Sequence, residues 1–114
     1  MISPEKKEQY LLIIRQIDIY FDRTLNYSGI KEELLKLEDL IEDTKQIPVY
    51  MKSALFARIN EVRSDLNLKT EGKAYSSFDA LVIELFQYLH IRRLPKSSLG
   101  ERIDAYLYPE RFEE

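Results

Sequence analysis

Apolar residues recur every three or four positions along most of the chain, the spacing that places them on one stripe of an α-helix. The first stripe follows Ser3 and Pro4, a capping residue and a proline at the first helical position. It predicts a long amphipathic helix over residues 4–25. The members of this stripe are Tyr10, Ile13, Ile14, Ile17, Tyr20, Phe21 and Leu25.

Two further amphipathic helices follow, each after a short connection. The second is expected over residues 29–43, after the polar residues 26–29. The third is expected over residues 48–66, because Pro48 stands where a helix can start. Connections this short favour antiparallel neighbours. The apolar residues of the two stripes are Ile30, Leu34, Leu37, Ile41, Met51, Leu55, Ile59, Val62 and Leu66.

The fourth helix is the most apolar. Residues 67–76 are polar and show no apolar period, so they are predicted to form the longest loop. The helix after them is expected over residues 77–93, with Ser76 and Asp79 as a capping box and Pro95 as its stop. Its stripe contains Phe78, Leu81, Val82, Leu85, Phe86 and Leu89.

A short fifth helix is expected over residues 99–107, opened by a second capping box of Ser98 and Glu101. No run of β-branched residues alternates as a strand requires. We therefore predict an all-α fold, a single-domain antiparallel helical bundle of four main helices plus a short C-terminal fifth helix over residues 1–114. The wide apolar arc of the first helix fits an intramolecular bundle or a dimer, which leaves the oligomeric state open.

The amino-acid composition excludes several classes of catalytic and metal-binding site. The 114 residues include 45% hydrophobic and 32% charged residues but no cysteine, which excludes disulfides, thiolate nucleophiles and cysteine zinc sites. His90 is the single histidine, so histidine-based triads and metal clusters are also excluded. We expect no enzyme activity, no cofactor and no metal. Without a signal-peptide core or a membrane-spanning run, we expect a cytoplasmic protein with no membrane partner.

The net charge of −3 divides into an acidic and a basic segment. Residues 29–44 hold six acidic residues and two lysines, and several tyrosines lie near the helix ends. An acidic helix face can replace nucleic-acid phosphate in a basic cleft, and tyrosine is enriched at protein interfaces. The sequence thus predicts a protein partner. The candidate partner-binding residues are Glu32, Glu38, Asp39, Glu42, Asp43, Tyr27 and Tyr50.

Two alternatives use other charged residues. A nucleic-acid-binding regulatory module would use the basic segment, whose cations are Arg92, Arg93, Lys96 and Arg102. The short helix that follows has few cations to release counterions, which makes nucleic acid the weaker interpretation. A third alternative is a nucleotide hydrolase that holds magnesium through carboxylates three residues apart on facing helices. Asp39 and Glu42 have this spacing, but Glu61 and Asp65 are four apart and form no second pair.

A resemblance covers about a third of the chain, residues 29–68. The residues that carry it are Gly29, Glu33, Leu34, Leu37, Leu40, Ile41, Ile47, Pro48, Ile59, Val62 and Leu66. Their order resembles the helical hairpin of small bacterial toxin-immunity proteins. The resemblance implies a short, cytoplasmic, non-enzymatic protein whose acidic face blocks a basic nuclease toxin. The leading hypothesis is an immunity protein or inhibitor that neutralises a cognate toxin by stoichiometric binding.

Overall fold

Helices make up the regular structure of the computed structural model, which describes residues 2–24, 26–68 and 71–91. No strand occurs in these ranges, so the all-α prediction with four main helices is confirmed. The fifth helix expected over residues 99–107 lies outside the described residues. The elements are α1 (Pro4–Ile19), the π-helical segment η1 (Tyr20–Thr24), α2 (Tyr27–Asp43), α3 (Val49–Asn67) and α4 (Glu71–Leu89).

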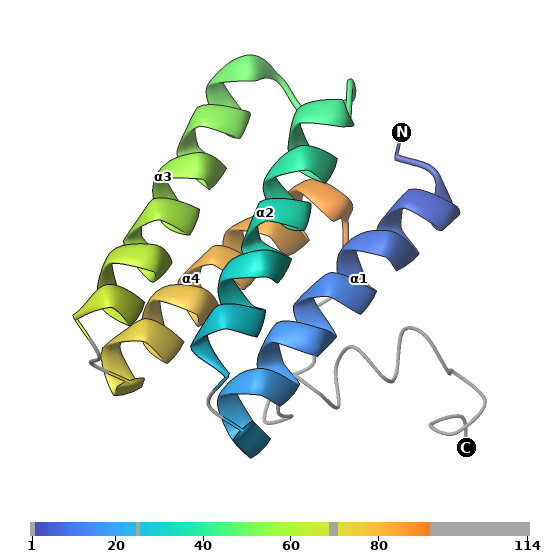
Figure 1. The fold of residues 1–114 in the computed structure, drawn as a ribbon. Helices are drawn as coiled ribbons and strands as arrows, with labels where there is room; N and C mark the ends of the chain where they lie inside the picture. The colour runs from blue at the N-terminus through green and yellow to red at the C-terminus, as the bar shows by residue number, and fades with distance from the viewer. Residues whose placement is uncertain (1, 25, 69–70, 92–114) are drawn as a thin grey trace.

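Consecutive helices pack against one another and alternate in direction (Figure 1). Helices α1, α2 and α3 lie side by side, and α4 crosses behind them toward α1. None of the helices in the described part of the chain combines the length and hydrophobicity that a membrane-spanning segment needs.

The start of α1 agrees with its predicted caps. The Ser3 hydroxyl accepts a hydrogen bond from the Lys6 amide at 3.2 Å, and Pro4 occupies the first helical position. The expected helix over residues 4–25 changes its hydrogen-bond pattern near its end, where η1 begins at Tyr20. A π turn of this kind widens the helix locally.

The second helix begins two residues earlier than the apolar pattern predicts. The Asn26 side chain caps it by accepting a hydrogen bond from the Gly29 amide at 3.0 Å. Gly29 lies where α2 meets η1, because a Cβ atom added there would lie 2.8 Å from Cε2 of Tyr20. The glycine therefore permits a close approach between these two elements.

The start of α4 differs from the prediction. The helix begins at Glu71, so most of the loop expected over residues 67–76 is helical and the expected cap Ser76 lies inside α4. Ala74 is completely buried and continues the stripe of Phe78 back by one turn. Alanine is a strong helix former but a weak hydrophobic signal, which explains why the pattern missed this turn.

The end of α4 also differs, since the helix stops at Leu89 and not near residue 93. His90 has a φ of 56°, the left-handed conformation that terminates helices. The Ile91 amide donates to the Phe86 carbonyl at 3.0 Å, and the His90 amide donates to the Gln87 carbonyl at 3.3 Å. These two bonds form a Schellman motif, which is usually signalled by glycine and here is formed by histidine.

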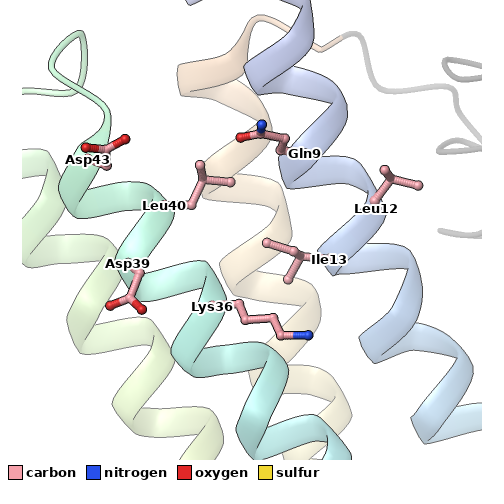
Figure 2. Close-up of a pocket in the computed structure, with 7 residues that line it drawn as sticks. All are labelled: Gln9, Leu12, Ile13, Lys36, Asp39, Leu40 and Asp43. Atoms are coloured by element: carbon pink, nitrogen blue, oxygen red, sulfur yellow. The ribbon is translucent and has the colours of Figure 1, made fainter.

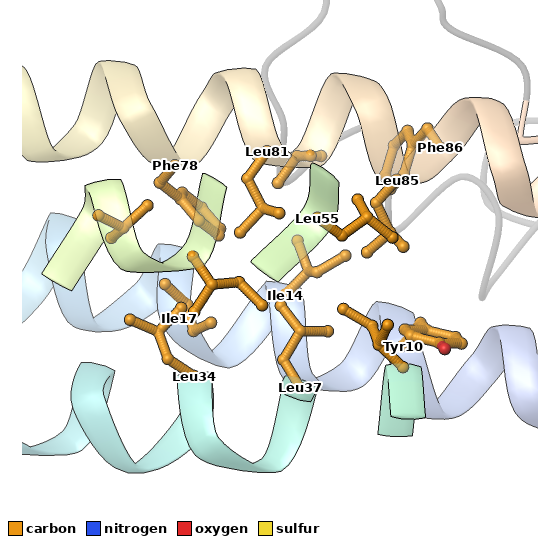
Figure 3. Close-up of a cluster of buried hydrophobic side chains, with 14 of the residues drawn as sticks. Tyr10, Ile14, Ile17, Leu34, Leu37, Leu55, Phe78, Leu81, Leu85 and Phe86 are labelled. Atoms are coloured by element: carbon orange, nitrogen blue, oxygen red, sulfur yellow. The ribbon is translucent and has the colours of Figure 1, made fainter. Parts of the chain in front are cut away.

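All four helices contribute to one hydrophobic core (Figure 3). Because helices in a bundle are held mainly by burial of their apolar stripes, this core fixes the relative positions of α1 and α2, which carry the site described next. The central side chains are Tyr10, Ile14, Ile17, Leu34, Leu37, Leu55, Phe78, Leu81, Leu85 and Phe86.

Candidate functional site

Four of the acidic residues singled out in the sequence share one outward face of α2. An α-helix turns by about 100° per residue, so positions 32, 39, 42 and 43 fall within an arc of about 100°. All four side chains are exposed. We call this face the acidic stripe, and its members are Glu32, Asp39, Glu42 and Asp43.

Nearby lysines neutralise the acidic stripe only in part, with Nζ of Lys52 donating a hydrogen bond to the Glu42 carbonyl at 2.8 Å. Within the described ranges, Asp39 and Glu42 make no ion pair. Asp43 lies 3.4 Å from Nζ of Lys6, but its side chain is 82% exposed. Ion pairs near the surface contribute only about 0–1 kcal/mol.

Lys36 lies beside the stripe but is held by a different carboxylate. Its Nζ donates to Oε1 of Glu33 at 3.0 Å. This hydrogen bond, together with the charge of Glu33, raises the pKa of Lys36 above its ordinary value. The positive charge of Lys36 therefore compensates the buried Glu33 more than it compensates the stripe.

The other predicted binding residues lie elsewhere. Glu38 forms an ion pair with Arg63 of α3, so its charge links two helices. Tyr27 is partly buried and packs against the core at the start of α2. Tyr50 is 71% exposed and lies in the first turn of α3, not on the face of α2 that carries the stripe.

A groove of about 690 Å³ runs between α1 and α2, directly beside the acidic stripe. Ile13 of α1 and Leu40 of α2 point into the space between the two helices (Figure 2). We call it the α1–α2 groove. Its apolar lining is Leu12, Ile13 and Leu40, and its polar lining is Gln9, Lys36, Asp39 and Asp43.

A buried polar contact fixes the walls of this groove. The Thr44 hydroxyl donates to the Leu40 carbonyl at 2.6 Å. The Tyr10 hydroxyl lies 2.6 Å from Oγ1 of Thr44 and 3.1 Å from the same carbonyl. Burial raises the pKa of Tyr10 to about 12. The neutral phenol thus ties α1 to the C-terminal end of α2.

The carboxylates that a magnesium-dependent nucleotide hydrolase would use do not come together in the described ranges. Asp65 is buried and accepts a hydrogen bond from the Ser77 hydroxyl of α4 at 2.5 Å. Asp39 and Glu42 lie instead on the exposed face of α2. No group of three potential metal ligands is found among the residues described. The cations of the nucleic-acid alternative, Arg92, Arg93, Lys96 and Arg102, lie outside these ranges.

No protein-family description matches the chain, and no curated protein or solved structure is significantly similar to it.

Proposed function

We propose that the protein is a non-enzymatic binding protein that engages a basic surface of another protein through the acidic stripe. The observation that carries this proposal is the exposure of four carboxylates on one face of a single helix. A helix holds these charges in fixed relative positions before binding. Such a field speeds the encounter with an oppositely charged surface and aligns the two partners.

The row of carboxylates supports a nucleic-acid-binding protein as the partner. Asp39 and Asp43 are separated by about 6 Å along the helix axis and point to the same side of α2. A nucleic-acid strand also presents a regular row of negative charges, which proteins neutralise with lysine and arginine side chains. A basic cleft that attracts phosphates would therefore also attract these carboxylates. We propose that the partner is a cognate toxin with nuclease activity and that one copy of this protein blocks one toxin molecule.

Affinity capture from the source cells, followed by an inhibition assay, tests this proposal. The double variant D39K/E42K changes the net charge from −3 to +1, and so does the matched control E8K/E61K, whose two sites are exposed on α1 and α3. We expect the wild type and the control to capture the same basic protein and to inhibit its nuclease activity at one equivalent. D39K/E42K should require an excess of about tenfold or more.

The outcomes separate the parts of the proposal. Equal capture by D39K/E42K and E8K/E61K would contradict a role for the acidic stripe. A stripe-dependent partner whose nuclease activity persists at saturating inhibitor would contradict toxin neutralisation. Circular dichroism of both variants should match the wild type, because all four substituted side chains are exposed.

A further inference from the structure

The α1–α2 groove joins an apolar surface to the acidic stripe. Leu12 is 51% exposed, and the groove shares Asp39 and Asp43 with the stripe. Exposed apolar surface bordered by charged residues is typical of a protein-binding site. The groove therefore adds an apolar contact to a surface that otherwise attracts a partner through charge.

The dimensions of the groove fit a helix. Its lining on α2 extends from Lys36 to Asp43, which is about 10 Å along the helix axis, or about two turns. Its lining on α1 spans one turn, from Gln9 to Ile13. The volume of about 690 Å³ has room for several side chains. An elongated element that presents two or three side chains from one face would fill it.

Two other modes of peptide recognition are disfavoured here. Strand addition needs an exposed sheet edge, and no strand occurs in the described ranges. Polyproline segments dock into grooves lined by aromatic side chains, whereas the apolar part of this groove consists of leucine and isoleucine and the groove has no aromatic lining residue. The remaining mode of recognition is an amphipathic helix that lies in an apolar groove. Such a helix is anchored by side chains at positions i, i+3 or i+4, and i+7.

We infer that the α1–α2 groove receives an amphipathic helix of the partner. Aliphatic anchors of that helix contact Leu12, Ile13 and Leu40, and lysine or arginine side chains beside them meet Asp39 and Asp43. This inference rests on the proposed function, because the basic character of the partner comes from it. A second copy of this chain is the poorer occupant, since it would bring its own acidic stripe against this one.

A peptide titration locates the site. The probe is an 18-residue synthetic peptide of leucine and lysine with leucine at helical spacing, and the control is a scrambled peptide of the same composition. We expect the ¹⁵N–¹H spectrum of the full chain to shift chiefly at Gln9, Leu12, Ile13, Leu40 and Asp43. Shifts centred on α3 or α4, an equal response to the scrambled peptide, or no response would overturn the inference.

Matched serine variants separate the groove from the stripe. Leu12 and Leu68 are both exposed leucines, and Leu68 lies at the end of α3 outside the groove. We expect L12S to weaken peptide binding about fivefold and L68S to change it less than twofold. Equal effects would overturn the groove assignment.

The binding of L12S and D39K/E42K to the captured partner separates the groove inference from the proposed function. If L12S binds the partner like the wild type while D39K/E42K does not, the groove inference fails and the acidic-stripe function stands. Loss of binding in both variants supports both. If R92S tightens peptide binding more than K73S, which removes the same charge from an exposed site on α4, the basic segment of the chain itself competes for the groove, which overturns a foreign helix as its occupant.

Discussion

At the scale of single residues, the clearest connection between packing and chemistry is Tyr10. Its ring is completely buried, and its hydroxyl lies between the Leu40 carbonyl and the Thr44 hydroxyl. The sequence placed Tyr10 correctly on the buried stripe of the first helix. It could not show the polar contact, because the partners lie 30 and 34 residues further along the chain.

The raised pKa of Tyr10 predicts a specific loss of stability at high pH. An unfolded tyrosine ionises near pH 10, whereas the folded Tyr10 has a pKa of about 12. The folded state therefore holds the proton more tightly, so this stabilisation is complete below pH 10 and is lost as the pH rises toward 12. Urea unfolding at pH 9 and pH 11.5 should show a larger decrease for the wild type than for Tyr10→Phe.

The stability of Tyr10→Phe at neutral pH serves as the control for the comparison at high pH. Thr44 can still donate to the Leu40 carbonyl in this variant, so we expect a loss of only about 1 kcal/mol in the free energy of unfolding at pH 7. A wild type and a variant that lose equal stability between pH 9 and 11.5 would contradict the assignment of the raised pKa to Tyr10.

At the scale of helices, the sequence predicted the buried faces of the helices better than the residues at which the helices begin and end. Most members of the four apolar stripes are buried. Ile13, Tyr20 and Met51 are only partly buried against the core, and Leu25 lies outside the described residues. The cap of α1 was also predictable, because Ser3 and Pro4 carry a local signal. The ends of α4 were not predictable, since Ala74 adds little to an apolar pattern and a left-handed histidine at position 90 lacks the usual glycine signal.

Two helical glycines predict opposite effects of the same substitution. A Cβ at Gly29 would lie 2.7 Å from Nδ2 of Asn26 and 2.8 Å from Cε2 of Tyr20, whereas one at Gly72 would meet nothing within 4 Å. We expect Gly29→Ala to destabilise the fold by about 1–3 kcal/mol through steric strain. Gly72→Ala should stabilise it by about 0.5–1 kcal/mol through higher helix propensity.

Chemical denaturation of the two alanine variants measures both effects against the wild type. The pair is internally controlled, because each variant adds one methyl group to a helix. A stabilising Gly29→Ala would show that η1 and α2 do not meet as closely as described. A destabilising Gly72→Ala would show that the open space beside the first turn of α4 is filled.

At the scale of the whole molecule, the candidate site combines a part that the sequence predicted and a part that it did not. The acidic stripe follows from the spacing of Glu32, Asp39, Glu42 and Asp43 along one helix, which the sequence contains directly. The groove arises only when α1 packs on α2, so its lining from Gln9 to Ile13 could not be read from the pattern. The pairing of Glu38 with Arg63 is equally a product of tertiary packing.

The salt dependence of the association rate with the captured partner tests the central claim most directly. We predict that raising the salt from 50 to 300 mM slows the wild type and the E8K/E61K control about tenfold or more, because screening removes electrostatic steering. D39K/E42K should associate slowly at low salt and change little. Equal rates and equal salt dependence for the two double variants would contradict binding through the acidic stripe.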